Sequence, residues 1–564
     1  MVLSDEKLAQ LLFEHKLLDQ HTYAELSTYA KNSGTSISEA LIEKRIVTED
    51  YLYQLIAAQL HVPFVRLSRG TIPDDVLTII PERLARKKKS ISFNRDPSGV
   101  HVAMLDPQDK PFIDTLQQKT GQPIIAYLTT ESDIKGAIQL YKKDLQKSFD
   151  DLLKDEVTQA DRSIVDSAPV EKIVDLLINY AYQDKASDIH FEPEENESLV
   201  RFRIDGILHD VLVVPKNLHD RIVTRIKILS RLRTDEHLSA QDGKMRIKLE
   251  EENLDIRVSI LPIVDGEKIV LRLLSSKTRE LTLLDLGMNS QDREKVEKAY
   301  SRSYGMILST GPTGSGKSTT IYGILKALNT REKNITTIED PVEYRIQGVN
   351  QIQVNTRTNL TFAAGLRSIL RQDPNIILVG EIRDNETAAI AVNAALTGHL
   401  VVSTLHTNDA ATALPRLIDM KVEPFLVAST VNVIIGQRLV RKICNTCRIS
   451  YTLPLPELTK HLDKALIAKH YETVGPSQEI RFYKGQGCSI CRNTGYKGRI
   501  GLFEVLVVSS QIRKLITEMN SADVIYRAAI AEGMTTMLDD GLQKVSMGQT
   551  TIEEVLRVTK VDTV

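Results

Sequence analysis

The chain contains no tryptophan, and aromatic residues make up only 5% of its 564 residues. Proteins that hold single-stranded nucleic acid present aromatic side chains on which the bases stack. The 72 basic and 74 acidic side chains give a formal net charge of −2, so no overall field attracts nucleic acid or an anionic membrane. Because aromatic residues are few and the net charge is nearly zero, binding to nucleic acid or to an anionic membrane is the less favoured interpretation.

Long apolar runs are also missing. None approaches the roughly 20 residues that span a bilayer, and the run NIILVG at residues 375–380 is typical of a buried strand. The first residues, MVLSDEKLAQ, carry two acidic groups and no apolar segment after a basic start, unlike a secretory signal. We therefore expect a cytoplasmic protein that does not cross a membrane by itself.

Cysteine occurs four times, as Cys444, Cys447, Cys488 and Cys491, which excludes a disulfide scaffold. The four residues form the pairs CNTC and CSIC, the arrangement of a tetrahedral Cys₄ zinc site. The segment between the pairs is longer than in compact zinc ribbons, so a small insert must fold back on itself. Redox-active pairs are the alternative, and structural zinc is the interpretation that we favour.

The length and the 42% content of hydrophobic residues indicate several domains, each with its own core. Residues 1–66 contain an internal repeat of two helical hairpins, in which Leu8 aligns with Ile37 and Leu12 with Leu41. The pattern then changes at each predicted boundary. We expect a small α+β part at 67–145, a linker at 146–168, a second α+β domain at 169–280 and an α/β domain at 281–564 with a cysteine insert at 441–500.

The last domain alternates apolar strands with helices. MILSTGP, ITTIED, IILVGEI and LVVSTLH read as strands, and a helix is expected from Lys317. Such alternation predicts a parallel sheet covered by helices. The fold class is therefore multidomain α/β.

The strongest motif is GPTGSGKS at residues 311–318, directly after the strand MILST. In this context backbone amides cradle phosphates, Lys317 reaches the terminal phosphates and Ser318 binds Mg²⁺. The predicted nucleotide-binding residues of this loop are Gly311, Pro312, Thr313, Gly314, Ser315, Gly316, Lys317, Ser318 and Thr319.

Acidic groups follow two of the predicted strands. Glu339, Asp340 and Glu343 lie in TTIEDPVEY, and Glu381 and Asp384 lie in LVGEIRD. Because the carboxyl ends of parallel strands face the ligand, we expect both clusters in the nucleotide cleft. Glu381 occupies the position at which an Asp commonly follows the apolar strand of an ATPase. Its longer side chain could place the carboxylate against the attacking water instead of only against the metal ion. An ion pair of Glu381 with Arg383 is the structural alternative.

Two histidines lie at opposite ends of the strand in TGHLVVSTLHTND, residues 397–409. His406 is at the carboxyl end and is the candidate for a role in the site. His399 is at the amino end. For each one, a histidine satisfied within the fold is the alternative.

Residues 187–491 carry SDIHFEP, VRFRIDG, GPTGSGKS, IEDPVEY, GLRSILRQDPN, VGEIRDNETA, TGHLVVSTLHTNDA, GQRLVRKIC and the two Cys-x-x-Cys pairs. With these motifs the chain strongly resembles the secretion ATPase superfamily (GspE/PilB family), most of all its type IV pilus extension ATPases. IPERLARKKKSISF, VAMLDPQD and ESDIKGAIQLY resemble the N-terminal domain of that family. The resemblance covers almost the whole chain.

The resemblance implies a RecA-like P-loop domain, preceded by a PAS-like α+β domain and an N-terminal regulatory domain. It implies a hexamer that binds ATP between the RecA-like domain and the preceding domain. Glu339, Asp340 and Glu343 would form the Asp box, and Glu381 would polarise water. His399 and His406 would form the His box.

The family also places arginines across the cleft. By resemblance, Arg257 and Arg272 face the phosphates from the second domain, while Arg367 and Arg371 are contributed at the subunit boundary. Arginines on a mobile domain gain a partner in the terminal phosphate and lose it on hydrolysis, which converts chemistry into domain motion. Salt-bridging surface arginines are the alternative.

Two features depart from the family. The loop DEHLSAQDGK at residues 235–244 lacks the arginines and proline of the family pattern, so we assign it no catalytic role. The repeats begin KLA at Lys7 and SIS at Ser36 instead of with Arg-Leu-Gly. Without that arginine we do not expect cyclic di-GMP to bind.

The function implied is a hexameric ATPase that powers type IV pilus assembly, with ATP/ADP, Mg²⁺ and Zn²⁺ as ligands. Implied partners are an inner-membrane platform protein of the PilC/GspF type and a cytoplasmic adaptor of the PilM/GspL type, which would hold the motor at the inner face of the membrane. The alternatives are a type II secretion ATPase, a RecA-like nucleic-acid translocase, and a binding module joined to a passive switch.

Overall fold

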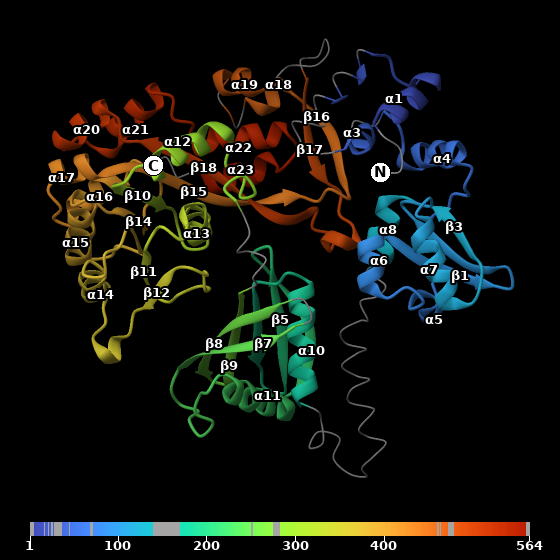
Figure 1. Ribbon diagram of the computed structural model, residues 1–564, viewed down its shortest axis with the longest axis horizontal. Coiled ribbons are helices and arrows are strands. Elements are labelled where there is room, and N and C mark those ends of the chain that lie inside the picture. The colour runs from blue at the N-terminus through green and yellow to red at the C-terminus, as the bar shows by residue number, and fades with distance from the viewer. Residues whose placement is uncertain are drawn as a thin grey trace. The chain divides into compact units, whose positions relative to one another are not determined.

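The computed structural model describes residues 5–15, 17–20, 22–23, 26–27, 36–43, 46–67, 72–138, 170–249, 252–274, 282–459, 462, 464–471 and 479–559. The predicted linker at 146–168 lies outside these ranges. The chain forms two compact units (Figure 1). The first comprises Met1–Ser148, Lys442–Gly498 and Lys544–Thr551, and the second comprises Phe149–Arg441, Arg499–Gln543 and Ile552–Val564.

The first unit begins with short amphipathic helices. Their bounds are α1 (Asp5–Glu14), α3 (Ile37–Glu43) and α4 (Glu49–Leu60). Leu8, Leu12, Ile37 and Leu41 are all buried in one apolar cluster, as the alignment of the two repeats predicts for core positions. Thr48 caps α4 by accepting a hydrogen bond from the amide of Tyr51. The helical repeat is therefore a packed body.

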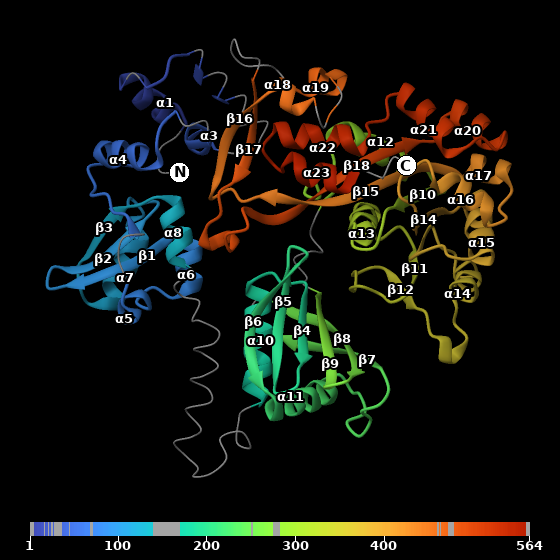
Figure 2. The same cartoon turned by 180° about the vertical axis from the view of Figure 1, so that it is seen from behind.

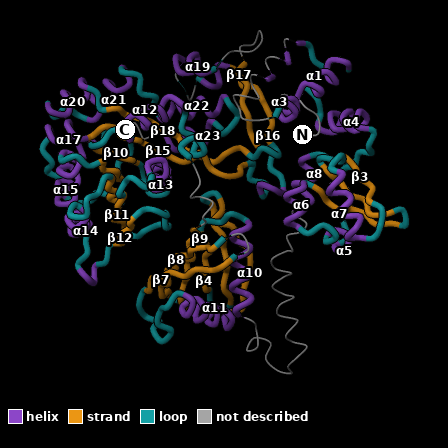
Figure 3. The backbone as a smooth tube through the Cα atoms, in the orientation of Figure 1, coloured by secondary structure: helices purple, strands orange, loops and turns teal. Residues whose placement is uncertain are grey.

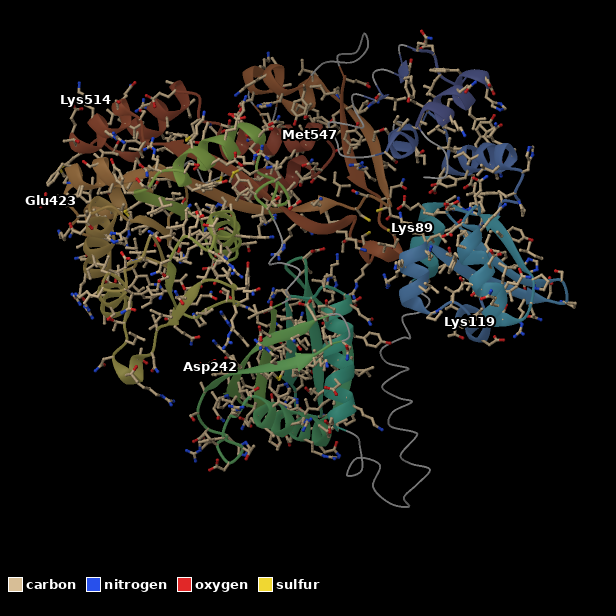
Figure 4. All side chains as sticks on the ribbon, viewed as in Figure 1. Lys89, Lys119, Asp242, Glu423, Lys514 and Met547 are labelled. Carbon is tan, nitrogen blue, oxygen red and sulfur yellow. The ribbon has the colours of Figure 1, made fainter. Side chains whose placement is uncertain are left out.

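A three-stranded sheet follows, in the order β1-β2-β3. Its elements are α5 (Asp74–Leu77), α6 (Glu82–Lys88), β1 (Ser90–Asp96), β2 (Gly99–Met104), α7 (Lys110–Thr120), β3 (Ile124–Leu128) and α8 (Glu131–Ile138). The sequence predicts one helix over residues 72–87, but the structure has two. Pro81, which has no N–H to donate, precedes α6 and separates it from α5. Lys119, labelled in Figure 4, donates to the carbonyl of Ile79 at 3.0 Å and ties α7 to this turn.

The cysteine insert completes the first unit. It consists of β16 (Arg448–Pro454), α18 (Leu455–Leu458), α19 (Lys464–His470), β17 (Glu479–Gly485) and the short 3₁₀ turn η5 (Ser489–Cys491). β16 and β17 pair antiparallel, with Arg448 opposite Gly485. The amide of Gln486 donates to the carbonyl of Cys447 at 2.9 Å. This hairpin explains how a long insert brings the two cysteine pairs together.

The second unit opens with an antiparallel sheet of six strands, in the order β6-β5-β4-β9-β8-β7. Its elements are α10 (Val170–Gln183), β4 (Asp188–Pro193), β5 (Glu197–Ile204), β6 (Ile207–Pro215), α11 (Lys216–Leu229), β7 (Gln241–Lys248), β8 (Asn253–Ile263) and β9 (Gly266–Leu274). Helices α10 and α11 lie together beside this sheet (Figure 2). The strands alternate buried and exposed residues, as in β8, because one face meets the helices and the other does not.

The rest of the second unit is built on a seven-stranded sheet, in the order β12-β11-β13-β14-β10-β15-β18. The strands are β10 (Gly305–Thr310), β11 (Ile335–Glu339), β12 (Asn350–Gln353), β13 (Ile376–Val379), β14 (Leu400–Leu405), β15 (Val431–Ile443) and β18 (Tyr496–Val507). The five pairs from β12 to β15 are all parallel. The parallel sheet predicted from the alternating pattern is therefore correct.

Helices cover both faces of this sheet. Apolar residues of α12 (Ser290–Tyr300) and α13 (Lys317–Leu328) pack on one face. The other face packs against α14 (Phe362–Ile369), α15 (Asn385–Leu396), α16 (Ala413–Asp419), α17 (Pro424–Thr430), α20 (Ser510–Thr517) and α21 (Ala522–Ala531). The result is a three-layer α/β sandwich.

The chain ends with α22 (Met537–Ser546) and α23 (Ile552–Thr559). Figure 3 draws α22, α23 and the other helices in purple. Throughout the described part of the chain, no helix combines the length and the apolar character needed to span a bilayer.

Glu554 anchors α23 to the end of β15. Its side chain is 3% exposed and forms an ion pair with Arg441 at 2.7 Å and another with Arg557 at 2.8 Å. Although burial acts to raise it, these hydrogen bonds and the amide of Arg441 lower the pKa of Glu554 to about 2. The carboxylate is therefore charged and paired throughout the physiological range.

We predict that Glu554→Gln loosens α23. Glutamine removes the charge that strengthens the hydrogen bonds to both arginines, which costs about 2 kcal/mol, and local opening should rise about 30-fold. Hydrogen exchange of peptides covering residues 552–559 at pH 7 measures this. Glu553→Gln, the exposed neighbour, is the control and should leave exchange unchanged. Equal exchange in both variants would contradict the anchoring role.

The same anchor has a defined pH range. Because the folded pKa of Glu554 lies below the ordinary value of 4.5, its contribution is complete above about pH 4.5 and is lost as the pH falls towards 2. The difference between the variant and the parent chain should therefore be constant from pH 6 to pH 8.

Candidate active site

The loop from β10 to α13 forms an open cradle of backbone amides. Gly311, Gly314 and Gly316 have φ values of 144°, 80° and 93°, in the region that favours glycine. A Cβ at Gly311 would lie 2.5 Å from the carbonyl oxygen of Gln437 and 2.6 Å from Ser315 Oγ. Only glycine leaves this cradle open, and its amides lie at the N-terminus of α13, where anions bind.

The cradle also contains polar side chains directed at a ligand position. Lys317 is buried, and its ammonium donates to the carbonyls of Gly311 at 2.8 Å and Pro312 at 3.1 Å. Burial lowers the pKa of Lys317, and the negative charge of Glu381 opposes this shift. Ser315 Oγ is buried and has no hydrogen-bond partner within the described residues, whereas Ser318 is exposed at the first turn of α13. These groups fit a phosphate chain with its Mg²⁺.

Glu381 lies two residues beyond the carboxyl end of β13 and is joined to His406, which directly follows β14. Glu381 Oε2 is 3.2 Å from His406 Nε2 and 2.8 Å from Arg383 Nε. The Glu381 side chain is 13% exposed, whereas His406 and Arg383 are more open. The contact with His406 agrees with a catalytic role of Glu381, and the contact with Arg383 agrees with the ion-pair alternative.

Glu339 ends β11 and is nearly fully buried. It accepts hydrogen bonds from the hydroxyl of Tyr322, from Thr337 Oγ1 at 2.6 Å and from Gln351 Nε2 at 3.2 Å. Burial, with the adjacent Glu339 charge, raises the pKa of Tyr322, so the phenol keeps its proton and donates. Glu339 is therefore held rigidly by side chains around it.

Glu343 faces the six-stranded sheet. Its carboxylate forms an ion pair with Arg257 Nη2 at 2.8 Å, and the same nitrogen donates to the carbonyl of Val342 at 3.1 Å. Arg257, Glu343 and Lys244 line a cavity of about 660 Å³ with Arg231, Arg246 and Arg345 among its other residues. The excess of cations makes this cavity suited to an anionic ligand.

The remaining predicted arginines have other partners. Arg272 is 58% exposed and forms an ion pair with Asp188 at 3.0 Å. Arg367 pairs with Glu386, and Arg371 donates to the carbonyl of Arg367 at 3.0 Å. Arg367 and Arg371 lie on the exposed side of α14 and immediately after it. Within a single chain, Arg272 and Arg367 thus have ion-pair partners, and Arg371 has a backbone one.

Two other predicted groups serve the fold. Asp384 caps α15 by accepting hydrogen bonds from the amide and hydroxyl of Thr387 at 2.8 and 2.9 Å. His399 lies at the amino end of β14, and its Nδ1 is 2.9 Å from the carbonyl of Ala394. The expectation that Asp384 points into the cleft is therefore not met, since its oxygens are committed to the helix.

Several side chains of the site do not stand out in the sequence. Tyr322, Gln351 and Gln437 support Glu339 and the cradle from positions far along the chain. Lys244, in the loop to which we assign no role, contacts Gln353 Oε1 at 2.5 Å. Burial lowers the pKa of Lys244, and the nearby charge of Arg257 acts in the same direction. The Gln-Asp-Gly before Lys244 was the available signal for this position.

The four cysteines meet in one cluster, with all four Sγ atoms within 4.8 Å of one another. Sγ–Sγ distances are 3.9 Å for Cys444–Cys488, 3.8 Å for Cys447–Cys491 and 3.6 Å for Cys488–Cys491. A tetrahedron with metal–sulfur bonds of about 2.3 Å has edges of about 3.8 Å. The cluster therefore fits a tetrahedral metal ion.

The surroundings of the cluster are typical of a metal site. Burial raises the pKa of the Cys447 and Cys488 thiols, so thiolates there need a compensating positive charge. Cys491 Sγ accepts from the amides of Cys488 at 3.2 Å and Gly495 at 3.3 Å. Although burial acts in the opposite direction, these amides contribute to the lowered pKa of Cys491. Such N–H groups orient sulfur ligands.

A glycine cradle on a parallel sheet, a carboxylate beyond the end of another strand of that sheet and a buried lysine define a P-loop nucleotide hydrolase. The model of the "Type II/IV secretion system protein" family matches residues 163–557, and that of the "MshEN domain" matches residues 60–147. The chain therefore belongs to the type II/IV secretion system protein family. It is a P-loop ATPase of that family.

Two relatives illustrate the similarity. The chain is 37% identical over 569 residues to the "Type IV pilus assembly ATPase PilB" of Myxococcus xanthus, covering 99% of each chain. It is 43% identical over 433 residues to the "Type II secretion system protein E" of Pseudomonas aeruginosa, covering 76% of this chain and 84% of the relative. The solved structure of the Legionella pneumophila ATPase DotB is 20% identical, with a TM-score of 0.51 over 68% of this chain and 94% of that one, and shares the fold.

The cysteine cluster gives a direct test. We predict that the purified chain binds about one equivalent of zinc and that Cys447→Ser loses most of it, because only three thiolates remain. Metal content after gel filtration with a mild chelator measures this. Thr446→Ser, within the same turn, is the control and should keep the metal. A parent chain without zinc, or a Cys447→Ser variant that keeps it fully, would contradict the assignment.

Proposed function

We propose that this ATPase is the hexameric motor of type IV pilus assembly and that Glu381 activates the water that cleaves ATP. The observation that carries the catalytic part is the position of Glu381. It lies beyond the end of β13, within hydrogen-bond distance of His406, and its charge acts on Lys317 of the cradle. A carboxylate so placed can orient a water molecule towards the terminal phosphate.

Each residue of the cradle then has a defined task. The amides of the glycine loop bind the phosphates, and Lys317 leaves the carbonyls of Gly311 and Pro312 to reach the terminal ones. Mg²⁺, held at Ser318, would supply positive charge to the phosphates. Glu339 and Glu343 lie on the far side of β13 from β10 and extend the acidic edge of the sheet.

During hydrolysis the oxygen of water forms a bond to the terminal phosphorus, and the bond between that phosphorus and the bridging oxygen breaks. ADP leaves with the bridging oxygen, and inorganic phosphate leaves with the oxygen of water. One proton of that water stays on the phosphate, and the other is released to solvent. Glu381 accepts the hydrogen bond of the attacking water and so fixes its direction. His406 Nε2 lies 3.2 Å from Glu381 Oε2 and helps to hold that carboxylate.

Arg257 offers a route from chemistry to motion. It is now paired with Glu343, and both line the cationic cavity with Lys244. A guanidinium that can bind either group binds the phosphate while the phosphate is present and returns to the carboxylate after its release. We propose that Arg257 makes this exchange, with Lys244 as a second cation. Arg272, Arg367 and Arg371 would act only in contact with a neighbouring subunit or a moved domain.

Pilus assembly is favoured over type II secretion by the extent of the similarity. The named pilus relative of Myxococcus xanthus aligns over 99% of this chain, including the N-terminal unit, whereas the named type II secretion relative aligns over 76%. The second candidate is supported by its higher identity of 43% within the aligned part. A nucleic-acid translocase has the support of neither similarity nor charge.

The remaining features of the motor are proposals of the same kind. They are zinc in the cysteine cluster, a PAS-like second domain, the domain division at residues 66, 145, 168 and 280, and a cytoplasmic location at the inner membrane. Partners of the platform and adaptor types would recruit the hexamer to the membrane. We assign no cyclic di-GMP site to the N-terminal helices.

We predict that Glu381→Gln lowers ATP turnover at least 100-fold while ATP binding persists, since Gln keeps the shape but cannot orient water as a base. Turnover by phosphate release, ATP binding by titration, and surface pili in cells carrying the variant provide the measurements. Glu332→Gln, an exposed glutamate between α13 and β11, is the control. Normal turnover by Glu381→Gln would refute the catalytic role, and lost turnover with normal pili would refute the pilus role.

A further inference from the structure

Glu504 is a buried carboxyl group with no part in the proposed chemistry. It lies on β18, and its residue is 2% exposed. A Cβ on Gly436 of the neighbouring β15 would lie 2.7 Å from Glu504 Oε1 and 2.8 Å from its Cγ. The absence of a side chain at Gly436 thus makes room for the carboxyl group inside the sandwich.

The carboxyl group holds a loop of the active site. Glu504 Oε1 accepts a hydrogen bond of 2.7 Å from the amide of Ala410. Ala410 is fully buried and lies four residues after His406. Between them, the carbonyl of Asp409 accepts from Thr407 Oγ1 at 2.9 Å and from Thr310 Oγ1 at 3.3 Å. The loop at residues 406–410 is thereby fixed to the end of β10, where the phosphate cradle begins.

Glu504 also reaches the C-terminal helices. It accepts a hydrogen bond from the amide of Met537, the first residue of α22. The adjacent Phe503 amide donates to Asp540 Oδ2 of α22 at 2.8 Å. Two backbone amides, one from the active-site loop and one from α22, therefore share one buried carboxyl group.

We propose that Glu504 is a positioning residue for ATP hydrolysis, which holds the loop at residues 406–410 against the first turn of α22 so that His406 faces Glu381. Through it, the C-terminal helices set the orientation of the pair that orients water. This inference rests on the proposed catalytic role of Glu381.

The charges around Glu504 come from every element packed on it. Asp409 of the loop and Arg438 of β15 act on its charge, Tyr526 of α21 feels that charge, and Asp539 of α22 acts on the same tyrosine. Burial, with the repulsion of Asp409, raises the pKa of Glu504 to about 7. Its protonation therefore changes within the working range of the enzyme.

The sign of the pH effect on stability follows. Because the folded pKa of Glu504 is raised above the ordinary 4.5, the folded state loses stability as the pH rises from about 4.5 to about 7. A carboxylate in a salt bridge has the opposite effect, because its lowered pKa makes the folded state more stable as the pH rises. Glutamine removes this dependence and keeps an acceptor oxygen for the two amides, but it brings an NH₂ group into the position of a carboxylate oxygen.

The test compares Glu504→Gln with Asp540→Asn, which removes a neighbouring buried carboxylate that also bonds a backbone amide between β18 and α22. We expect Glu504→Gln to lower kcat about tenfold with little change in KM for ATP and to alter the pH profile of kcat near pH 7. Hydrogen exchange of residues 406–412 should rise. Asp540→Asn should lower thermal stability and keep the parent pH profile.

A double variant shows whether Glu504 acts through the loop. In a His406→Ala background, Glu504→Gln should cause no further loss of kcat, because the residue that it positions is gone. An additive loss, or parallel losses in Glu504→Gln and Asp540→Asn that follow thermal stability, would overturn the inference. If the parent chain itself lacks ATP turnover, the proposed function falls; if the parent turns over ATP and Glu504→Gln matches it, only this inference falls.

Discussion

The parallel register of four strands is the constraint on which the site depends. β11, β13, β14 and β10 pair in that order, with Ile338 opposite Val379, Val379 opposite Ser403 and Thr310 opposite Leu405. Because the strands run the same way, the residues that follow them emerge at one edge of the sheet. Groups that are separate in sequence, namely the phosphate cradle, the Glu381 carboxylate and the His406 ring, are thus gathered at that edge.

The residues around that edge make two kinds of contact. Some are buried hydrogen bonds that hold a group in place, and others are partly exposed ion pairs that can change partner. Glu339 is enclosed by three donors, and the loop after β14 is held by Thr310 and by Glu504. Arg257, in contrast, bridges from the six-stranded sheet to Glu343 through a partly exposed ion pair. A motor needs both kinds, because the chemistry requires preorganised groups whereas the motion requires a partner that can be replaced.

Local sequence patterns predicted the main features of the fold and the site. The glycine cradle, the parallel sheet and the cysteine cluster follow from residues close in sequence or from pairs whose spacing is diagnostic. Prediction failed at positions whose local role in the fold was misread. Asp384 looks like a site residue but caps α15, and Pro81 divides a stretch that reads as a single helix.

Supporting side chains were beyond the reach of sequence patterns because their contacts depend on the tertiary fold. Gln437 contacts Ser315 across 122 positions, and Glu504 contacts Ala410 across 94. No periodicity links such residues, because the sheet order brings them together. The family resemblance implies a phosphate contact for Arg272, and in this chain its guanidinium forms an ion pair with Asp188.

ATP turnover of the purified chain tests the account most directly. The assay is run alone, with the cytoplasmic part of a pilus platform protein, and with DNA at matched ionic strength. Turnover that rises with the platform protein and is unaffected by DNA is the predicted result. Turnover that rises with DNA and ignores the platform protein would contradict an assembly motor and favour a nucleic-acid translocase.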